Sequence, residues 1–155
     1  MTDAPPVVAL FGATALGKSR VAVELSGLLG ADIVVADSMQ VYAGLPIVTN
    51  QPDAESRRGA RYHLVGWASP RDDLTVAEYA ARAHGVLDGL VAAGRPVVVE
   101  GGSGLYLRAV LGDLGFGGAP DDERRRALEE RWERAPDELV AELRRRAPDV
   151  AARTD

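Results

Sequence analysis

The sequence contains no cysteine, and this absence excludes disulfides, thiolate metal ligands and a cysteine nucleophile together. No apolar run approaches the roughly 20 residues that a helix needs to cross a bilayer, and the N-terminus lacks the basic and apolar regions of a signal peptide. The formal net charge of −5 disfavours an overall basic surface for nucleic acid, although it allows a local basic groove. We therefore expect a cytoplasmic protein that makes no membrane contact.

Lysine is almost absent as well: Lys18 is the only lysine, and every other basic residue except histidine is arginine. It lies in Gly12-Ala13-Thr14-Ala15-Leu16-Gly17-Lys18-Ser19, which has the pattern G-x-x-x-x-G-K-[ST] of a phosphate-binding P-loop. The glycines let backbone N–H groups turn towards phosphate oxygens, while Lys18 neutralises phosphate charge and the Ser19 hydroxyl can ligate Mg²⁺. The sequence therefore predicts a phosphate site at residues 12–19.

Short apolar runs alternate with helical patterns along the first two thirds of the chain. Buried strands are expected over 7–11, 33–36 and 96–99, a further short strand over 63–67, and helices from Lys18 to Gly30 and from the capping box Thr75–Glu78 to Gly94. Such alternation implies parallel strands joined by right-handed crossovers. We predict an α/β fold of the P-loop NTPase-like type, with a parallel sheet flanked by helices.

Two other regions differ from this pattern. Residues 40–60 are rich in Gly, Pro, Asn and Gln, which is typical of a long functional loop rather than of packed structure. From Pro120 the chain predicts charged helices, with acidic residues at 121–123 and arginines at 144–146 placed to suit the helix dipole. We interpret these charges as solvated helix surface, with a nucleic-acid patch as the alternative. The chain then divides into a core over 1–119 and an incomplete helical extension over 120–155.

Two acidic residues follow apolar strands, Asp37 and Glu100. Glu100 occupies the place of the Walker B acid that a kinase or ATPase requires, though it matches that pattern imperfectly. Because ligands of open α/β sheets bind beyond the carboxyl ends of the strands, residues 12–19, Asp37 and Ser103 should converge there. Asp37 is either a catalytic carboxylate or the cap of a turn, and the loop holds either a nucleoside triphosphate or another diphosphate.

Three blocks together resemble the bacterial tRNA dimethylallyltransferases, also called tRNA isopentenyltransferases. They are the P-loop at 12–19, Ala-Asp-Ser-Met-Gln-Val-Tyr-Ala-Gly-Leu at 36–45 and Gly-Gly-Ser-Gly-Leu-Tyr-Leu-Arg-Ala at 101–109. Their order and spacing match the family, as do His63-Leu64-Val65-Gly66 and the Arg-rich helix after Pro120. The second block is the more specific, because simple kinases lack it.

The resemblance implies transfer of a dimethylallyl group from dimethylallyl diphosphate to N6 of the adenosine 3′-adjacent to the tRNA anticodon, with Mg²⁺ as cofactor. The P-loop would then hold the leaving diphosphate instead of ATP. Asp37 matches the general base, and Ser103 a position where the family usually has a threonine hydroxyl near the reacting amine. Contacts with tRNA are implied for Asp37, Ser38, Met39, Gln40, Ser103 and Arg124. The expected partners are tRNA and the prenyl diphosphate, and we expect a monomer.

The chain also departs from the family pattern. Ala13 replaces a proline and Leu16 a small or polar residue, but neither change removes a phosphate ligand, since the main chain binds the phosphate. Gln51 stands where a lysine is common, and Glu100 where the family tends to be apolar, so that Glu100 is either a Walker B mimic or a tolerated strand end. Family members are about twice as long, and their second half supplies an arginine for the diphosphate. We therefore expect the chain to be an N-terminal portion.

Two alternative activities remain at this point. The pair Thr49-Asn50 resembles the adenylate isopentenyltransferases, which would prenylate free adenine nucleotide. A small-molecule P-loop kinase is the other alternative, and it would transfer phosphate from ATP.

Overall fold

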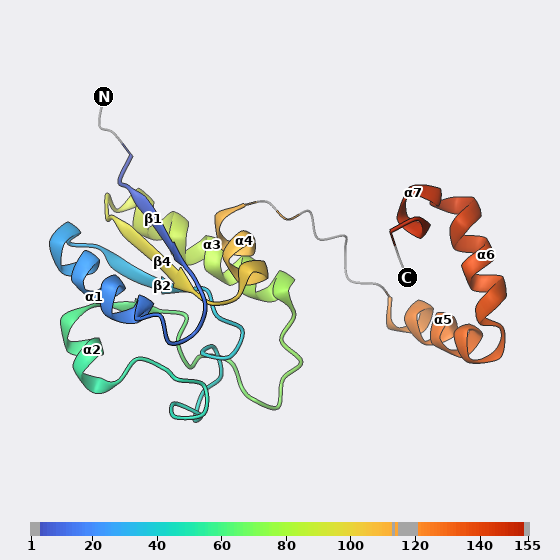
Figure 1. Cartoon of the computed structure of the whole chain (residues 1–155), viewed down its shortest axis with the longest axis horizontal. Helices are drawn as coiled ribbons and strands as arrows, with labels where there is room; N and C mark the ends of the chain where they lie inside the picture. The colour runs from blue at the N-terminus through green and yellow to red at the C-terminus, as the bar shows by residue number, and fades with distance from the viewer. Residues whose placement is uncertain (1–3, 113, 115–120, 154–155) are drawn as a thin grey trace. The chain divides into compact units, whose positions relative to one another are not determined.

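The computed structural model describes residues 4–112, 114 and 121–153, and the chain forms two compact units, Met1–Gly115 and Phe116–Asp155. The first unit contains a parallel β-sheet flanked by helices, and the second contains helices only among its described residues (Figure 1). The predicted α/β fold is therefore confirmed for the first unit.

The sheet has four strands in the order β1-β4-β2-β3, and every pair of neighbours is parallel. The strands are β1 (Val7–Phe11), β2 (Asp32–Val35), β3 (Tyr62–His63) and β4 (Val97–Gly101). In the register of the sheet, Glu100 of β4 lies between Leu10 of β1 and Val35 of β2. The carboxyl ends of these three strands consequently meet at one edge of the sheet.

Helices α1 (Lys18–Leu29), α2 (Ala54–Gly59), α3 (Val76–Ala92) and α4 (Gly104–Leu111) belong to the same unit. Helix α1 ends at Gly30, whose φ of 62° is left-handed, as the sequence predicts. The capping box that begins α3 is formed, with Glu78 N–H donating to Thr75 Oγ1 at 3.2 Å and Thr75 N–H donating to Glu78 Oε2 at 2.8 Å. Both predicted helix boundaries are confirmed.

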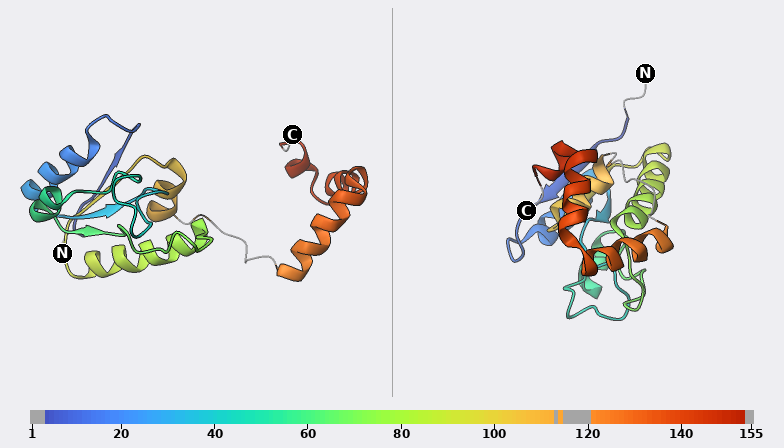
Figure 2. Two further views of the ribbon diagram at one scale, coloured as in Figure 1. Left: turned by 90° about the horizontal axis from the view of Figure 1, so that it is seen from below. Right: turned by 90° about the vertical axis from the view of Figure 1, so that its right-hand side faces the viewer.

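The sheet has a hydrophobic core on each face, and α1 and α3 lie on opposite faces (Figure 2, left). Ala22 of α1 packs with Ile33 and Val98, whereas Tyr79 of α3 packs with Val97 and Val99. Successive side chains of a strand point to opposite faces, so the α1 face of β4 carries Val98 and then Glu100. The alternation of β4 thus directs the Glu100 side chain towards the helix that follows the P-loop.

Two strand predictions need correction. β1 was expected to be buried, but its exposure alternates, with Val7 40% and Phe11 58% exposed. The reason is its place at the edge of the sheet, since in the described part of the chain it pairs only with β4. The strand expected over 63–67 is also shorter, because the left-handed φ values of Leu64 and Gly66 end the extended backbone after His63.

The segment 40–60 is mostly loop, as its composition predicts, with α2 near its end, but it is anchored to the core at a few buried positions. Val41 is fully buried and Thr49 nearly so, and α2 begins at Ala54 after Asp53, whose carboxylate accepts the N–H of Ser56 at 2.7 Å. Gln51 holds the loop together, because its Nε2 donates to the carbonyls of Gln40 at 2.9 Å and Tyr42 at 2.7 Å. Composition predicted a loop without showing these tertiary hydrogen bonds.

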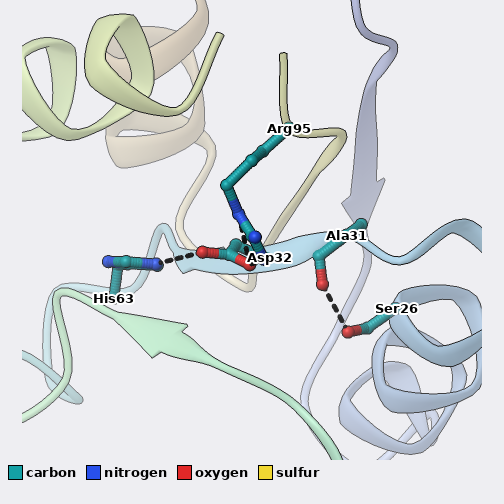
Figure 3. A network of polar contacts seen from close by, with 5 residues as sticks. All are labelled: Ser26, Ala31, Asp32, His63 and Arg95. Atoms are coloured by element: carbon teal, nitrogen blue, oxygen red, sulfur yellow. Dashed lines mark hydrogen bonds and ion pairs between the residues drawn. The ribbon is translucent and has the colours of Figure 1, made fainter. Parts of the chain in front are cut away.

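A buried polar network stabilises the amino-terminal end of the sheet, opposite the P-loop (Figure 3). The buried Asp32 carboxylate accepts hydrogen bonds from Arg95, which precedes β4, and its other oxygen lies 2.9 Å from Nε2 of His63 in β3. Burial alone would raise the pKa of Asp32, but the hydrogen bonds from Arg95 and His63 outweigh it and hold the pKa below its usual value. The network therefore ties β2 to β3 and to the turn that leads into β4.

The second unit consists of α5 (Asp122–Arg134), α6 (Pro136–Arg146) and α7 (Pro148–Ala151). Arg131 of α5 donates to Glu142 of α6 at 2.8 Å, and this hydrogen bond together with the positive charge of Arg146 lowers the pKa of Glu142. The predicted charged helices are thus confirmed. Within the residues that the structure describes, no helix is both long and apolar enough to cross a membrane.

Candidate functional site

The P-loop connects the end of β1 to the start of α1. Two of its residues, Ala15 with φ of 68° and Gly17 with φ of 78°, have left-handed backbone, which curls the chain ahead of the helix. Lys18 Nζ donates to the carbonyl oxygen of Ala13 at 2.8 Å, so the ammonium lies over the loop. That bond uses one of three N–H donors, and the others can serve a phosphate.

A cavity of about 450 Å³ lies beyond the carboxyl ends of the strands. Its lining comes from the P-loop and from three segments that follow β2 or end β4: Thr14, Ala15, Gly17, Lys18, Ser19 and Arg20; Asp37, Met39 and Gln40; Val48, Thr49 and Asn50; and Glu100, Gly101 and Gly102. Four stretches of sequence therefore contribute to one site. This is where ligands bind in open α/β sheets.

Not every predicted site residue lines this cavity. Ser103 follows the lining residue Gly102 directly, but it lies outside the lining as the N-cap of α4, where its side chain makes no capping hydrogen bond. Ser38 is partly buried beside the lining, and the Leu16 side chain is exposed. Arg124 belongs to α5 in the second unit, so it is described with that unit alone.

Asp37 has two structural roles. Its Oδ1 accepts the backbone N–H of Met39 at 2.8 Å and that of Gln40 at 3.3 Å, which caps the turn after β2. Its Oδ2 lies near the end of the neighbouring strand β4, because a Cβ built on Gly102 would lie 3.7 Å from it. The predicted turn cap is therefore present, and the same side chain lines the cavity, while its catalytic role stays a prediction.

Gly101 is required by the approach of β4 to β2. A Cβ at this position would lie 1.9 Å from the carbonyl oxygen of Ala36, a distance that no side chain can adopt. The two strands come this close because Ala36 N–H donates to the carbonyl of Glu100 at 2.6 Å. The glycine thus brings the end of β4 against the segment that carries Asp37.

Glu100 is a buried acid, with 2% of its surface exposed. Both carboxylate oxygens are buried, and among the described residues neither accepts a hydrogen bond of good geometry. Burial raises the pKa of Glu100 above its usual value and the Asp37 carboxylate adds to this, while the Ser19 hydroxyl and the Lys18 ammonium act in the opposite direction. A buried acid whose charge is only partly compensated therefore lies beside the P-loop.

The oxygen groups of the cavity suit a hard divalent cation. Ser19 offers a hydroxyl, and Asp37 and Glu100 offer carboxylates. In the described ranges, no group of three or more His, Asp or Glu side chains could hold a metal ion by itself. A cation here would share its coordination shell with phosphate oxygens, as Mg²⁺ commonly does.

Sequence reasoning missed several lining residues. Arg20 follows the P-loop and pairs with Glu24 at 3.3 Å, and Val48 lies beside Thr49 and Asn50 in the packed loop. The loop residues were considered only for their likeness to another family. The unusual composition of 40–60 was the available indication that this segment contributes to a site.

The parallel sheet, the loop of pattern G-x-x-x-x-G-K-S at the end of β1 and the cavity that this loop lines together with Asp37 and Glu100 define a P-loop α/β protein. A family model described as IPP transferase matches residues 40–155. The tRNA dimethylallyltransferase of Parafrankia sp. (strain EAN1pec) is 46% identical over 151 residues, which cover 97% of this chain and 47% of the relative. The chain belongs to the IPP transferase family, as the resemblance of its motifs implied.

A second relative and two solved structures are similar to this chain as well. The tRNA dimethylallyltransferase of Thermomicrobium roseum is 41% identical over 155 residues, which cover 99% of this chain and 47% of the relative. The crystal structure of full-length tRNA isopentenylpyrophosphate transferase from Bacillus halodurans gives a TM-score of 0.69 at 31% identity, with 97% of this chain and 50% of that chain covered. A eukaryotic dimethylallyltransferase acting on tRNA shares the fold, with a TM-score of 0.79 at 23% identity over 97% of this chain and 38% of that chain. The chain spans about half the length of the curated relatives it matches.

Proposed function

We propose that the protein transfers a dimethylallyl group from dimethylallyl diphosphate to N6 of the adenosine 3′-adjacent to the tRNA anticodon. Two findings support the proposal: the chain belongs to the IPP transferase family, and its curated relatives are named tRNA dimethylallyltransferases. The structural observation that carries it is the shared cavity, in which the Asp37 carboxylate and the P-loop line one space. A phosphate site beside a carboxylate is what prenyl transfer from a diphosphate to an amine requires.

The P-loop acts on the leaving group. As the bond between C1 of the dimethylallyl group and the diphosphate oxygen breaks, the electron pair stays on the diphosphate. Backbone N–H groups of residues 12–19 and the Lys18 ammonium stabilise that developing charge. The Ser19 hydroxyl would hold a divalent cation, which when bound would further neutralise the diphosphate.

Asp37 acts on the acceptor. The adenine N6 forms the new bond to C1, and the proton that it releases passes to the Asp37 carboxylate as general base. The hydrogen bonds from Met39 and Gln40 to Oδ1 orient the carboxylate and leave Oδ2 for that proton. The adenosine must leave its stack to reach the cavity, which a single-stranded loop allows at modest cost.

The tRNA contacts form a second part of the proposal. Met39 and Gln40 line the cavity, and Ser38 and Ser103 adjoin it, so these residues are placed to contact the extruded nucleotide and its backbone. The Ser103 hydroxyl serves the reacting amine, and Arg124 contributes a positive charge for the phosphate backbone. We propose Mg²⁺ as the divalent cation.

The two alternative activities are not favoured by the names of the relatives. Thr49 and Asn50 do line the cavity, which is the observation that an adenylate acceptor would need. A kinase would use ATP as the donor. The acceptor and the donor therefore have to be tested separately.

The test offers both acceptors and both donors. The chain, alone and joined to the second half of the Parafrankia relative, is incubated with labelled dimethylallyl diphosphate or with labelled ATP, and in each case with unmodified tRNA or AMP. Label on tRNA in the joined form is the expected result. Label on AMP alone, or phosphate transfer from ATP with no prenyl transfer, would contradict the proposal.

A further inference from the structure

Glu100 differs from the other deeply buried acid of the sheet. Asp32 is equally buried, but Arg95 and His63 donate to its carboxylate. Glu100 has no such ion pair among the described residues: the Ser19 hydroxyl and the Lys18 ammonium are near enough to lower its pKa, but neither makes a hydrogen bond of good geometry to its buried oxygens. A buried carboxylate with so little compensation is unfavourable for folding, so its presence at this position calls for a ligand.

The surroundings of Glu100 indicate which ligand. Its side chain leaves β4 on the α1 face and lines the cavity with Lys18, Ser19 and Asp37. The nearby Lys18 ammonium attracts the carboxylate but does not donate to it, since among the described residues its hydrogen bond goes to the carbonyl of Ala13. The missing partner is therefore a group that can enter the cavity.

Charge balance favours a cation over a further hydrogen-bond donor. Asp37 and Glu100 contribute two carboxylates, and the diphosphate adds more negative charge. Against these, the cavity lining offers Lys18 and the exposed Arg20, which also pairs with Glu24. A divalent cation removes this excess, and carboxylate and hydroxyl oxygens are the ligands it prefers.

We propose that Glu100 is the carboxylate that supports a divalent cation bound between the Ser19 hydroxyl and the diphosphate. This inference rests on the proposed function in one respect, namely that the P-loop holds a diphosphate. It adds to the phosphate site a residue that lies outside the pattern G-x-x-x-x-G-K-[ST]. Glu100 thereby makes diphosphate binding depend on the cation.

The test compares the affinity of the full chain for inorganic diphosphate in EDTA and in Mg²⁺, measured by titration calorimetry. The wild-type chain should bind diphosphate more tightly with Mg²⁺. In Glu100→Gln, this gain should fall about tenfold, as expected when a supporting ligand of a metal is lost. In EDTA the same variant should bind as tightly as the wild type or more tightly, because a negative charge beside the anion is gone.

The opposite effects in EDTA and Mg²⁺ separate a metal role from a structural one. The inference would be overturned, while the proposed function stands, if Glu100→Gln weakened diphosphate binding equally in both solutions. It would also be overturned if the variant left the gain in affinity from Mg²⁺ unchanged. A wild-type chain that binds no diphosphate in either solution would contradict the proposed function itself. A second readout is the affinity for Mn²⁺ in the presence of diphosphate, measured from the electron paramagnetic resonance signal of Mn²⁺ in the wild type and in Glu100→Gln.

Two further variants serve as controls, one for folding and one for net charge. Glu100→Val should lose the gain from Mg²⁺ as Glu100→Gln does, and both should unfold at or above the wild-type temperature because an unpaired buried charge is removed. Glu55→Gln removes an equivalent carboxylate from the exposed surface of α2 and should leave diphosphate binding unchanged in both solutions. A matching loss of the Mg²⁺ gain in Glu55→Gln would overturn the inference, since net charge would then explain it.

Discussion

The Asp37 carboxylate accepts the backbone N–H of Met39 at 2.8 Å through one oxygen and keeps the other for the cavity. The hydrogen bond sets the direction of the side chain without using its full acceptor capacity. An asparagine can make the same bond through its amide oxygen, but it cannot accept a proton at neutral pH. Local structure and proton transfer can therefore be tested separately at this position.

Asp37→Asn should lower prenyl transfer by about 100-fold or more, since a positioned general base contributes on that order. Diphosphate affinity and the unfolding temperature should remain near wild type. Single-turnover transfer to tRNA and calorimetric titration of diphosphate check the two halves of the prediction. Asp37→Ala serves as the structural control, because it also removes the cap and should cost about 1 kcal/mol of stability. Transfer at the wild-type rate in Asp37→Asn would exclude Asp37 as the base.

Lys18→Ala should weaken diphosphate binding by about 10- to 100-fold, which corresponds to the loss of a charged hydrogen bond. The fold should be retained, since among the residues that the structure describes the Lys18 ammonium donates only to the carbonyl of Ala13. Calorimetric titration of inorganic diphosphate measures the effect. Arg71→Ala, which removes a positive charge far along the chain in an exposed turn, is the matched control and should bind normally. Equal affinity in Lys18→Ala and wild type would mean that the ammonium does not contact the anion.

Gly101→Ala should destabilise the first unit by about 3 kcal/mol or more, because the new methyl group meets the backbone of Ala36 and the strand cannot simply rotate away. Thermal unfolding followed by circular dichroism measures this. Gly85→Ala is the matched control within α3, where an added Cβ contacts nothing and should raise stability by roughly 0.5–1 kcal/mol. The same unfolding temperature for Gly101→Ala and wild type would show that β2 and β4 can move apart freely.

Gln51→Ala should loosen the packed loop 40–51, since two hydrogen bonds to the carbonyls of Gln40 and Tyr42 are lost. We expect a loss of about 1–2 kcal/mol and faster amide hydrogen exchange in this loop. Gln51→Lys is the informative comparison, because an ammonium can donate to both carbonyls, and it should restore most of the protection. Exchange rates unchanged in Gln51→Ala would show that other contacts hold the loop.

Asp32→Asn should cost about 2 kcal/mol at neutral pH, less than a fully buried ion pair because Arg95 and His63 are each about one third exposed. The pKa of Asp32 is lowered by folding, so its contribution is fully present above its unfolded pKa of about 4 and is lost as pH falls through the lower folded value. Unfolding free energies measured from pH 7 to pH 2 should therefore converge for the two proteins at acid pH. Curves that stay parallel would contradict this account.

The sequence alone determined the P-loop, the boundaries of α1 and α3 and the family. These features depend on local chemistry: glycines that permit left-handed backbone, a capping box within four residues and motifs whose spacing is read along the chain. Residue type also marked Asp37 as important, although it left open whether the side chain caps a turn or faces a ligand.

The tertiary structure decided the rest. Pairing across the sheet made β1 an edge strand and shortened β3, and hydrogen bonds from Gln51 hold together a segment whose composition predicted a loop. The same pairing gave Asp32 its hydrogen-bond partners and left both oxygens of Glu100 buried without a hydrogen bond of good geometry among the described residues. The physical reason is that burial and compensation of a charge depend on neighbours that lie far away in the sequence, so a strand of the form Val-Val-Val-Glu cannot reveal them by itself.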